Sequence, residues 1–243
     1  MRQNLSTRPD YSRVLRFHLR TMLGSSMIGS RLIASQGHHE NLALTKDTFL
    51  CLEGFPRSAN TYFLNVIKTL NPDLGHIAHH THLAGQIKQA VAWNIPTVLL
   101  LRDPLSACSS MLIAEPKLPP KWVLHYYIRF HKSLINVSNK LCIIPFNQCL
   151  HDITKTFERI NSELGLNLNT RSIHDSEIEI IHNHITDYND LVKQRDTLKA
   201  IPCAERNIKK AKTNEIIRSQ PKFHKAVSVY EQIGALVKYE IQE

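Results

Sequence analysis

The stretch TFLCLEGFPRSANTYF, residues 48–63, constrains this chain more than any other. An apolar run of strand length leads into a short turn, and the residues after the turn have helical spacing. Gly54 and Thr61 occupy the first and last fixed positions of the nucleotide-binding pattern G-x-x-x-x-G-K-[ST]. Backbone amides of such a turn, together with the helix N-terminus, can receive a phosphate group. The stretch therefore predicts a strand, a phosphate-binding turn and a helix.

The turn departs from the pattern at its lysine. Ala59 and Asn60 replace Gly-Lys, so no lysine reaches toward β- and γ-phosphates, and Arg57 is the cation inside the turn. ATP or GTP hydrolysis is therefore disfavoured, a P-loop kinase becomes a weak alternative, and a different phosphorylated group is favoured. The other interpretation is a simple turn that ends in an ordinary helix cap at Ser58 or Asn60.

Strand and helix patterns alternate along the chain. The strongest further strands are expected at 95–101 and 141–146, with a weaker one at 74–80, and residues 119–140 are expected to form one long helix. This alternation predicts a three-layer, P-loop-like α/β fold with a mostly parallel central sheet flanked by helices. We expect a basic, partly helical extension over residues 1–45 and a single α/β domain over 46–243.

Size and charge narrow the class of ligand only coarsely. The chain has 243 residues, a net charge of +9 and five cysteines without a C-x-x-C pair. The charge favours an anionic ligand, a nucleic acid or an acidic surface. The cysteine pattern argues against a disulfide framework or a cysteine zinc site, and no apolar run has the length of a membrane span, so the expected location is cytoplasmic. The helix pattern at 14–23 fits a helix packed on the domain, a membrane-surface helix or a contact with an anionic substrate.

A second candidate site is LLLRDPLSACSSM. Arg102 closes the predicted strand, Asp103 and Pro104 read as the cap and first residue of a helix, and Ser110 follows Arg102 by eight residues. Ligands of parallel α/β sheets gather at the carboxyl ends of the strands, so this segment and the first turn could hold two phosphates of one ligand. The alternative is a structural ion pair or cap.

These motifs together resemble a known family. P-R-S-A-N-T after a strand, then T-H-L, then L-L-R-D-P-x-x-x-x-x-S is similar to the sulfotransferases that use 3′-phosphoadenosine 5′-phosphosulfate (PAPS). That family has a loop resembling Y-P-K-S-G-T-T-W and a 3′-phosphate motif of Arg with Ser eight residues later. The ordered match runs from about Phe49 to Ser110, with weaker echoes in 141–166 and in the last helix.

The resemblance implies a role for each matching residue. Arg57 falls on the loop lysine, which neutralises the leaving group, and Arg102 with Ser110 falls on the 3′-phosphate motif. The expected 5′-phosphate and adenine contacts are Ser58, Ala59, Asn60, Thr61 and Tyr62.

The sequence also departs from the family. Ala59 replaces a glycine, and the C-terminal R-K-G-x-x-G-x-x-K segment of cytosolic animal members has no counterpart. The residues that could replace that segment, or form a solvated face, are Arg206, Lys209, Lys210 and Lys212.

Histidines follow the second predicted strand, in HHTHLAGQ. His82 matches the histidine of the family's K-T-H-L stretch, which implies a catalytic base, and His80 stands where that stretch has lysine. Glu53, next to the loop, is the alternative base or an ordinary strand-end carboxylate. His80 and His82, spaced to share one face of a strand, would also form a workable zinc pair, although no neighbouring Cys or carboxylate completes it.

The predicted function is transfer of a sulfuryl group from PAPS, as co-substrate and without a metal, to a hydroxyl or amine. The alternative is a non-catalytic P-loop protein that binds a nucleotide or polyanion. We expect a small-molecule, sugar or lipid-headgroup acceptor rather than nucleic acid. The aromatic helix at 122–130 and the C-terminal third would shape its pocket, although aromatics at helical spacing also suit a core.

Overall fold

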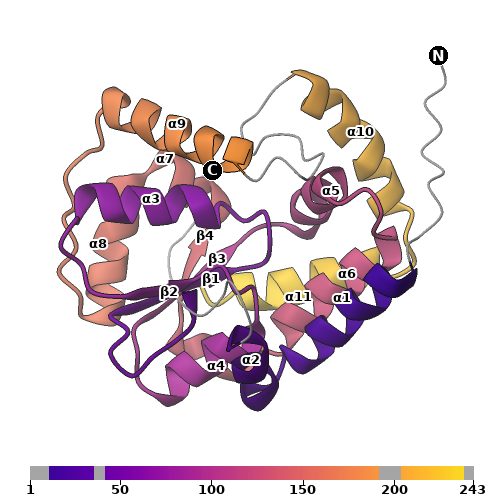
Figure 1. The fold of residues 1–243 in the computed structure, drawn as a ribbon, viewed down its shortest axis with the longest axis horizontal. Helices are drawn as coiled ribbons and strands as arrows, with labels where there is room; N and C mark the ends of the chain where they lie inside the picture. Colours follow the sequence, from indigo (N-terminus) through magenta and orange to yellow (C-terminus); the bar gives the residue numbers. More distant parts are fainter. Residues whose placement is uncertain (1–10, 36–41, 192–203, 238–243) are drawn as a thin grey trace.

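A four-stranded parallel sheet organises the chain, shown in the computed structural model of Figure 1, which describes residues 11–35, 42–191 and 204–237. The strands are β1 (Leu50–Gly54), β2 (Ile77–His79), β3 (Thr97–Leu101) and β4 (Cys142–Pro145), in the order β2-β1-β3-β4. Every neighbouring pair is parallel, so all four carboxyl ends lie at one edge. The predicted α/β class with a parallel sheet flanked by helices is confirmed.

Helices cover both faces of the sheet. Successive side chains of β3 point to opposite faces, so Val98 and Leu100 join one hydrophobic cluster while Leu99 and Leu101 join another. The first cluster is completed mainly by α3 (Asn60–Leu70), α8 (Ile153–Leu164) and α9 (Asp175–Leu191). The second is completed by α4 (Ala84–Ala92), α5 (Pro104–Ala114), α6 (Pro120–Lys132) and α11 (Phe223–Gly234). Burial on both faces explains the uninterrupted apolar run of β3.

The helix expected over residues 119–140 is shorter than predicted. α6 ends at Lys132, and a 3₁₀ helix, η2 (Ile135–Lys140), follows it. The break lets fully buried Leu134 pack into the core and returns the chain to the sheet at β4. A short helix, α7 (Phe146–His151), comes directly after β4, where no separate helix was expected.

The N-terminal segment contains two helices that pack on the domain. α1 (Tyr11–Leu23) lies against α6, and α2 (Met27–Ala34) lies against α4. Residues 1–10 and 36–41 of the predicted extension fall outside the described residues. No helix in the part of the chain that the structure describes is long and apolar enough to cross a bilayer.

The described residues of the last third form helices and connecting segments but no strand. α10 (Ala204–Arg218) packs on α5 and carries Lys209, Lys210 and Lys212 of the predicted basic run. The side chain of Arg206 and the residue Cys203 fall outside the described residues. The four described cysteines are free and buried: Cys51, Cys108, Cys142 and Cys149.

Candidate functional site

The carboxyl ends of β1, β2 and β3 bring the candidate residues together. The loop 55–59 follows β1, the turn 80–83 follows β2, and Arg102 follows β3. Because β1 lies between β2 and β3, its loop can contact residues from both neighbours. Three segments that are far apart in the sequence therefore meet at one edge of the sheet, which the sequence predicted for the loop and Arg102.

The loop after β1 requires two L-residues in left-handed backbone conformation. Arg57 has φ 72° and Ala59 has φ 65°, a region that costs a residue with a Cβ roughly 1 kcal/mol or more. The loop also begins close to β3, since a Cβ on Gly54 would lie 2.7 Å from the carbonyl oxygen of Leu100. Asn60 Nδ2 closes the loop by donating to the Phe55 carbonyl at 3.2 Å. This backbone is strained and fixed by its neighbours.

Helix α3 begins without a side-chain cap. Ala59 occupies the N-cap position, and no side chain accepts a hydrogen bond from the first turn there. The alternative of an ordinary cap at Ser58 or Asn60 is therefore wrong. Ser58 is fully buried beside this helix start, and its Oγ has no hydrogen-bond partner among the described residues. Unpaired first-turn amides, the positive end of the helix dipole and an unpartnered hydroxyl suit an anionic oxygen.

Two arginines link the loop to the segment after β3. Arg57 Nε donates to Ser110 Oγ at 3.2 Å, and Arg102 Nη1 donates to the Arg57 carbonyl at 2.5 Å. The Arg102 guanidinium lies over the ring of Phe146 at 3.9 Å, and Tyr127 donates its hydroxyl to the Arg102 carbonyl at 2.7 Å. The residues that match the two phosphate motifs thus form one contiguous group.

The segment after β3 also begins its helix as the sequence predicted. Asp103 caps α5 by accepting from the Ser106 amide at 2.8 Å, and Pro104 is the first helical residue. Its carboxylate is thus committed to the helix start, while the preceding residue, Arg102, reaches the loop.

Tyr62, the predicted adenine contact on α3, is half-buried. It faces the ring of His182 on α9, with ring centroids 6.0 Å apart.

The histidine segment is a turn rather than part of a strand. β2 ends at His79, and both His80 and His82 have positive φ, at 56° and 54°. The expectation that His80 and His82 share one face of a strand is therefore wrong, because the backbone leaves the extended conformation before either residue. No group of three or more His, Cys, Asp or Glu side chains in the described part of the chain is arranged to hold a metal ion.

Glu53 holds this turn from inside the protein. Its side chain is fully buried, Oε1 accepts from the Thr81 amide (2.8 Å) and hydroxyl (2.7 Å), and Oε2 accepts from the His82 amide (3.1 Å). Gln86 Nε2 donates the fourth hydrogen bond to Glu53, to Oε1 at 3.1 Å. Burial raises the pKa of Glu53 to about 7, against the lowering effect of these hydrogen bonds. Glu53 therefore fixes the conformation of the histidine turn from a fully buried position.

The turn orients the rings of His82 and His80. His82 Nδ1 lies 2.8 Å from the Gly54 carbonyl oxygen, which can only accept, so Nδ1 carries the proton and Nε2 the lone pair of the neutral ring. Tyr126 donates its hydroxyl to the His82 carbonyl at 2.6 Å. His80 contacts Thr61 Oγ1 through Nε2 at 2.9 Å and His79 through Nδ1 at 2.7 Å. Burial lowers the pKa of His80 to about 3, so its ring is neutral at pH 7.

Sequence reasoning undervalued Glu53 and missed its partners Thr81 and Gln86. It also missed the contacts of Tyr126 with His82 and of Tyr127 and Phe146 with Arg102. One signal was present: a carboxylate inside a strand that is buried on both faces needs hydrogen-bond partners. No sequence pattern indicated which residues from α4 and α6 would supply the other contacts.

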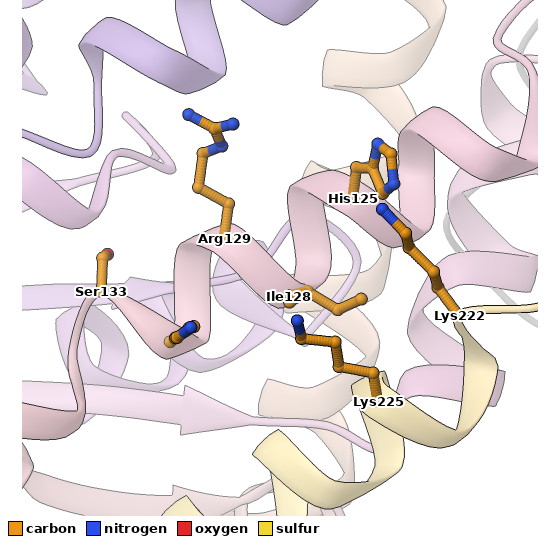
Figure 2. A pocket seen from close by; sticks show the side chains of 7 residues that line it. His125, Ile128, Arg129, Ser133, Lys222 and Lys225 are labelled. Carbon is orange, nitrogen blue, oxygen red and sulfur yellow. The ribbon is translucent and has the colours of Figure 1, made fainter.

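A separate open pocket of about 500 Å³ lies between α6 and α11 (Figure 2). Its lining is strongly cationic and comprises His125, Ile128, Arg129, Lys132, Ser133, Lys222 and Lys225. It shares α6 with the site, since Tyr126 and Tyr127 of that helix contact His82 and Arg102. Helical spacing places the pocket residues of α6 on the opposite face from these tyrosines.

In comparisons with known proteins, this chain matches solved structures. No family model matches the sequence, and no curated protein matches it. Among solved structures, the chain is similar to the mouse sulfotransferase SULT7A1, whose crystal structure is complexed with PAP. The TM-score is 0.44 and the identity 15%, over 92% of this chain and 94% of that chain.

Proposed function

We propose that this chain is a sulfotransferase that passes the sulfuryl group of PAPS to a hydroxyl or amine of a small acceptor. The observation that carries the proposal is the contiguous group at the strand ends. Arg57 contacts Ser110, Arg102 contacts the Arg57 backbone, and the phosphate loop that contains Arg57 adjoins the histidine turn. Two candidate phosphate-binding elements and a candidate base at one edge of the sheet are what a 3′,5′-bisphosphate donor and its transfer reaction require.

The 5′-phosphosulfate would lie against the loop after β1. Ser58 Oγ is buried without a partner among the described residues, and the start of α3 has no side-chain cap, so both fit an anionic oxygen. Thr61, one residue into α3, links this end to the histidine turn through its hydrogen bond to His80. Left-handed Ala59 supplies the sharp turn that the family makes with glycine.

The 3′-phosphate would lie against Arg102 and Ser110. Stacking on Phe146 and the contact with the Arg57 carbonyl fix the orientation of the Arg102 guanidinium, which favours bidentate recognition of a phosphate. Ser110 already accepts a hydrogen bond from Arg57, so the two arginines lie close enough to act on one doubly phosphorylated ligand.

His82 would act as the general base. Its Nδ1 proton is held by the Gly54 carbonyl, so Nε2 is the atom that would take the proton of an acceptor hydroxyl or amine, and its side chain is 23% exposed. PAPS supplies the activated sulfuryl group. As the acceptor oxygen or nitrogen bonds to sulfur, its proton passes to His82 Nε2, and the bond between sulfur and the 5′-phosphate oxygen breaks. Arg57 and the amides of α3 would stabilise the negative charge on the leaving 3′,5′-bisphosphate.

Purified protein with radiolabelled PAPS and a panel of hydroxyl and amine acceptors tests the proposal. We expect label transfer by the wild type. The His82→Ala variant should transfer at least about a hundredfold more slowly while it binds the donor normally, since a positioned general base contributes roughly 10²–10⁴-fold. Absence of donor binding would overturn the proposal. Normal donor binding without transfer to any acceptor, or transfer that His82→Ala leaves unchanged, would favour the non-catalytic binder or another base.

A further inference from the structure

Helices α1 and α2 present an apolar surface to solvent. We call it the hairpin face, and its residues are Leu15, Leu19, Met22, Leu23, Met27, Ile28 and Leu32. Each is between 41% and 75% exposed, and together they are seven of the ten exposed large hydrophobic residues of the described chain. The seven residues lie on two consecutive helices that contact each other. Large exposed apolar residues gathered in one part of a chain indicate an interaction surface, whereas residues scattered singly would need no explanation.

The hairpin face is distinct from the side of α1 that packs on the domain. Val14 is buried, and Phe17 makes an edge-to-face contact with Tyr126 of α6 at a centroid distance of 5.3 Å. Leu15 and Leu19 are one turn apart on the other side of the helix, and Met22 and Leu23 continue the row. α1 therefore has two apolar sides, of which the domain uses one.

Contacts with α4 hold the hairpin in place. The Gly85 amide donates to the Gly24 carbonyl at 2.8 Å, and Lys88 Nζ donates to the Ser25 carbonyl at 2.7 Å. The approach is so close that a Cβ on Gly85 would lie 2.0 Å from the Ser26 carbonyl oxygen. The hairpin face is thus a fixed surface of the folded domain.

The surroundings of the hairpin face are cationic. Arg16 and Arg31 are exposed on the two helices, Arg20 is part-buried and donates to the Thr81 carbonyl, and residues 14–34 include no Asp or Glu. Beside α2, the charged groups of Arg31 and Lys46 lie 5.2 and 4.2 Å from the ring centroid of Trp93. A half-buried tryptophan flanked by basic side chains is typical of a membrane–water interface.

The cationic pocket of Figure 2 adjoins the same hairpin. The rings of His18 on α1 and Trp122 on α6 are 4.5 Å apart, and Trp122 is 5.7 Å from His125, which lines the pocket. The pocket's four other cations form no ion pair with a carboxylate of the described residues. These cations are Arg129, Lys132, Lys222 and Lys225. Burial and the charge of Lys222, followed by other cations, lower the pKa of His125, which agrees with an uncompensated positive potential.

We propose that the hairpin face docks on an anionic lipid surface, with its leucines, isoleucine and methionines entering the interface while the surrounding arginines and lysines meet lipid headgroups. Apolar insertion and attraction to anionic lipids add, and each basic residue near such a surface strengthens binding about fivefold. A second copy of the chain fits less well, because a symmetric contact would bring the same cations together without carboxylates to oppose them. The proposal is independent of the transfer reaction.

Co-sedimentation of the full chain with vesicles tests the proposal. One vesicle set is phosphatidylcholine alone, and the other is an equal mixture of phosphatidylcholine and phosphatidylglycerol. We expect the chain to bind the mixed vesicles, and to bind pure phosphatidylcholine vesicles at least about tenfold more weakly. Binding to the mixed vesicles should fall as salt is added. The triple variant Leu15→Gln, Ile28→Gln and Leu32→Gln should lose at least about tenfold in binding to the mixed vesicles.

A matched variant and a second measurement keep the test sharp. The double variant Ile180→Gln and Ile208→Gln removes exposed apolar residues on α9 and α10, and it should bind like the wild type. Because all five positions are exposed, thermal unfolding should be little changed in either variant. Absence of vesicle binding by the wild type, or equal binding by the triple variant, would overturn the proposal. A further outcome would also overturn it: light scattering shows a wild-type dimer and a monomeric triple variant, and the wild type binds no vesicles. That result would assign the face to a second copy of the chain.

Discussion

The loop after β1 and the turn after β2 lie side by side at the sheet edge and are held in opposite ways. In the turn, the buried Glu53 carboxylate accepts four hydrogen bonds, from Thr81, His82 and Gln86. In the loop, Ser58 Oγ is buried without a partner among the described residues, and the helix that follows has no side-chain cap. Both segments contain left-handed L-residues, and buried Asn60 satisfies one loop carbonyl, but the loop keeps a buried hydroxyl without a partner among the described residues.

This difference separates two kinds of polar group. Buried polar groups that are satisfied inside the protein stabilise one conformation, whereas unsatisfied groups cost free energy until a ligand pairs with them. We therefore expect changes in the turn to reduce stability and changes in the loop to reduce ligand binding.

The largest expected effect is loss of stability when Glu53 is removed. Glu53→Ala leaves several buried donors without an acceptor and should lower the free energy of unfolding by at least about 3 kcal/mol, measured by chemical denaturation. Arg57→Ala, a truncation of similar size in the loop, should cost less than about 1 kcal/mol and weaken donor binding at least about tenfold. If Glu53→Ala does not fold, Glu53→Gln should still fold with reduced stability. Equal stability losses for the Glu53 and Arg57 variants would contradict the comparison.

Two buried hydroxyl groups provide a closer match. Thr81→Val removes one hydrogen bond to Glu53 and should lower the free energy of unfolding by about 1–3 kcal/mol. Binding of PAPS should change little. Ser58→Ala should leave stability within about 0.5 kcal/mol of the wild type but weaken donor binding roughly tenfold or more. Denaturation and calorimetric titration of the same two preparations measure both quantities. The reverse pattern would show that the loop and not the turn is the structural element.

The turn should also set how the free energy of unfolding depends on pH. His80 and Glu53 should contribute to this dependence in opposite directions. The pKa of His80 is about 3 in the folded protein, so its unfolded form takes up a proton first as pH falls below about 6.5, and stability is lost. His80→Asn, which tolerates positive φ, should therefore lose about 2 kcal/mol less than the wild type between pH 7 and 5. Glu53 has a raised pKa of about 7, so its contribution is present at low pH and is lost as pH rises through 7.

Denaturation curves at several pH values check these signs. Relative to the wild type, Glu53→Gln should lose less stability as pH rises from 5 to 8, whereas His80→Asn should lose less as pH falls from 7 to 5. Variants that both follow the wild-type profile would show that neither group titrates as its burial implies.

The smallest expected effect concerns the backbone of the loop. Ala59 has φ 65°, so Ala59→Gly relieves strain and should stabilise the protein by about 0.5–1 kcal/mol. Ala211, in the interior of α10, is the control, because Ala211→Gly should cost about 1 kcal/mol. Thermal unfolding resolves the two signs. Loss of stability in Ala59→Gly would mean that the loop conformation is not strained.

The sequence was sufficient for the parts of the fold that local chemistry dictates. β3 follows from a continuous apolar run, and the start of α5 follows from Asp103 and Pro104. Gly165 ends α8 with φ 65°, a conformation that favours glycine. The gathering of the loop, Arg102 and the histidine segment at one edge follows from parallel topology.

The rest depended on contacts between distant residues. The sequence could not show that α6 ends at Lys132, because the break serves the packing of Leu134 and the return to β4. Nor could it show that the histidines lie in a left-handed turn, because Glu53 and Gln86, on two other elements, hold that turn in place.

Selective binding of a 3′,5′-bisphosphate tests the central claim most directly. Isothermal titration of the wild type with adenosine 3′,5′-bisphosphate, and separately with adenosine 5′-monophosphate, compares two ligands that differ in the 3′-phosphate. Because charge-assisted hydrogen bonds from Arg102 would hold that group, we expect the bisphosphate to bind at least about tenfold more tightly, and Arg102→Ala to abolish the difference. Equal affinity for the two nucleotides, or binding of neither, would contradict the account.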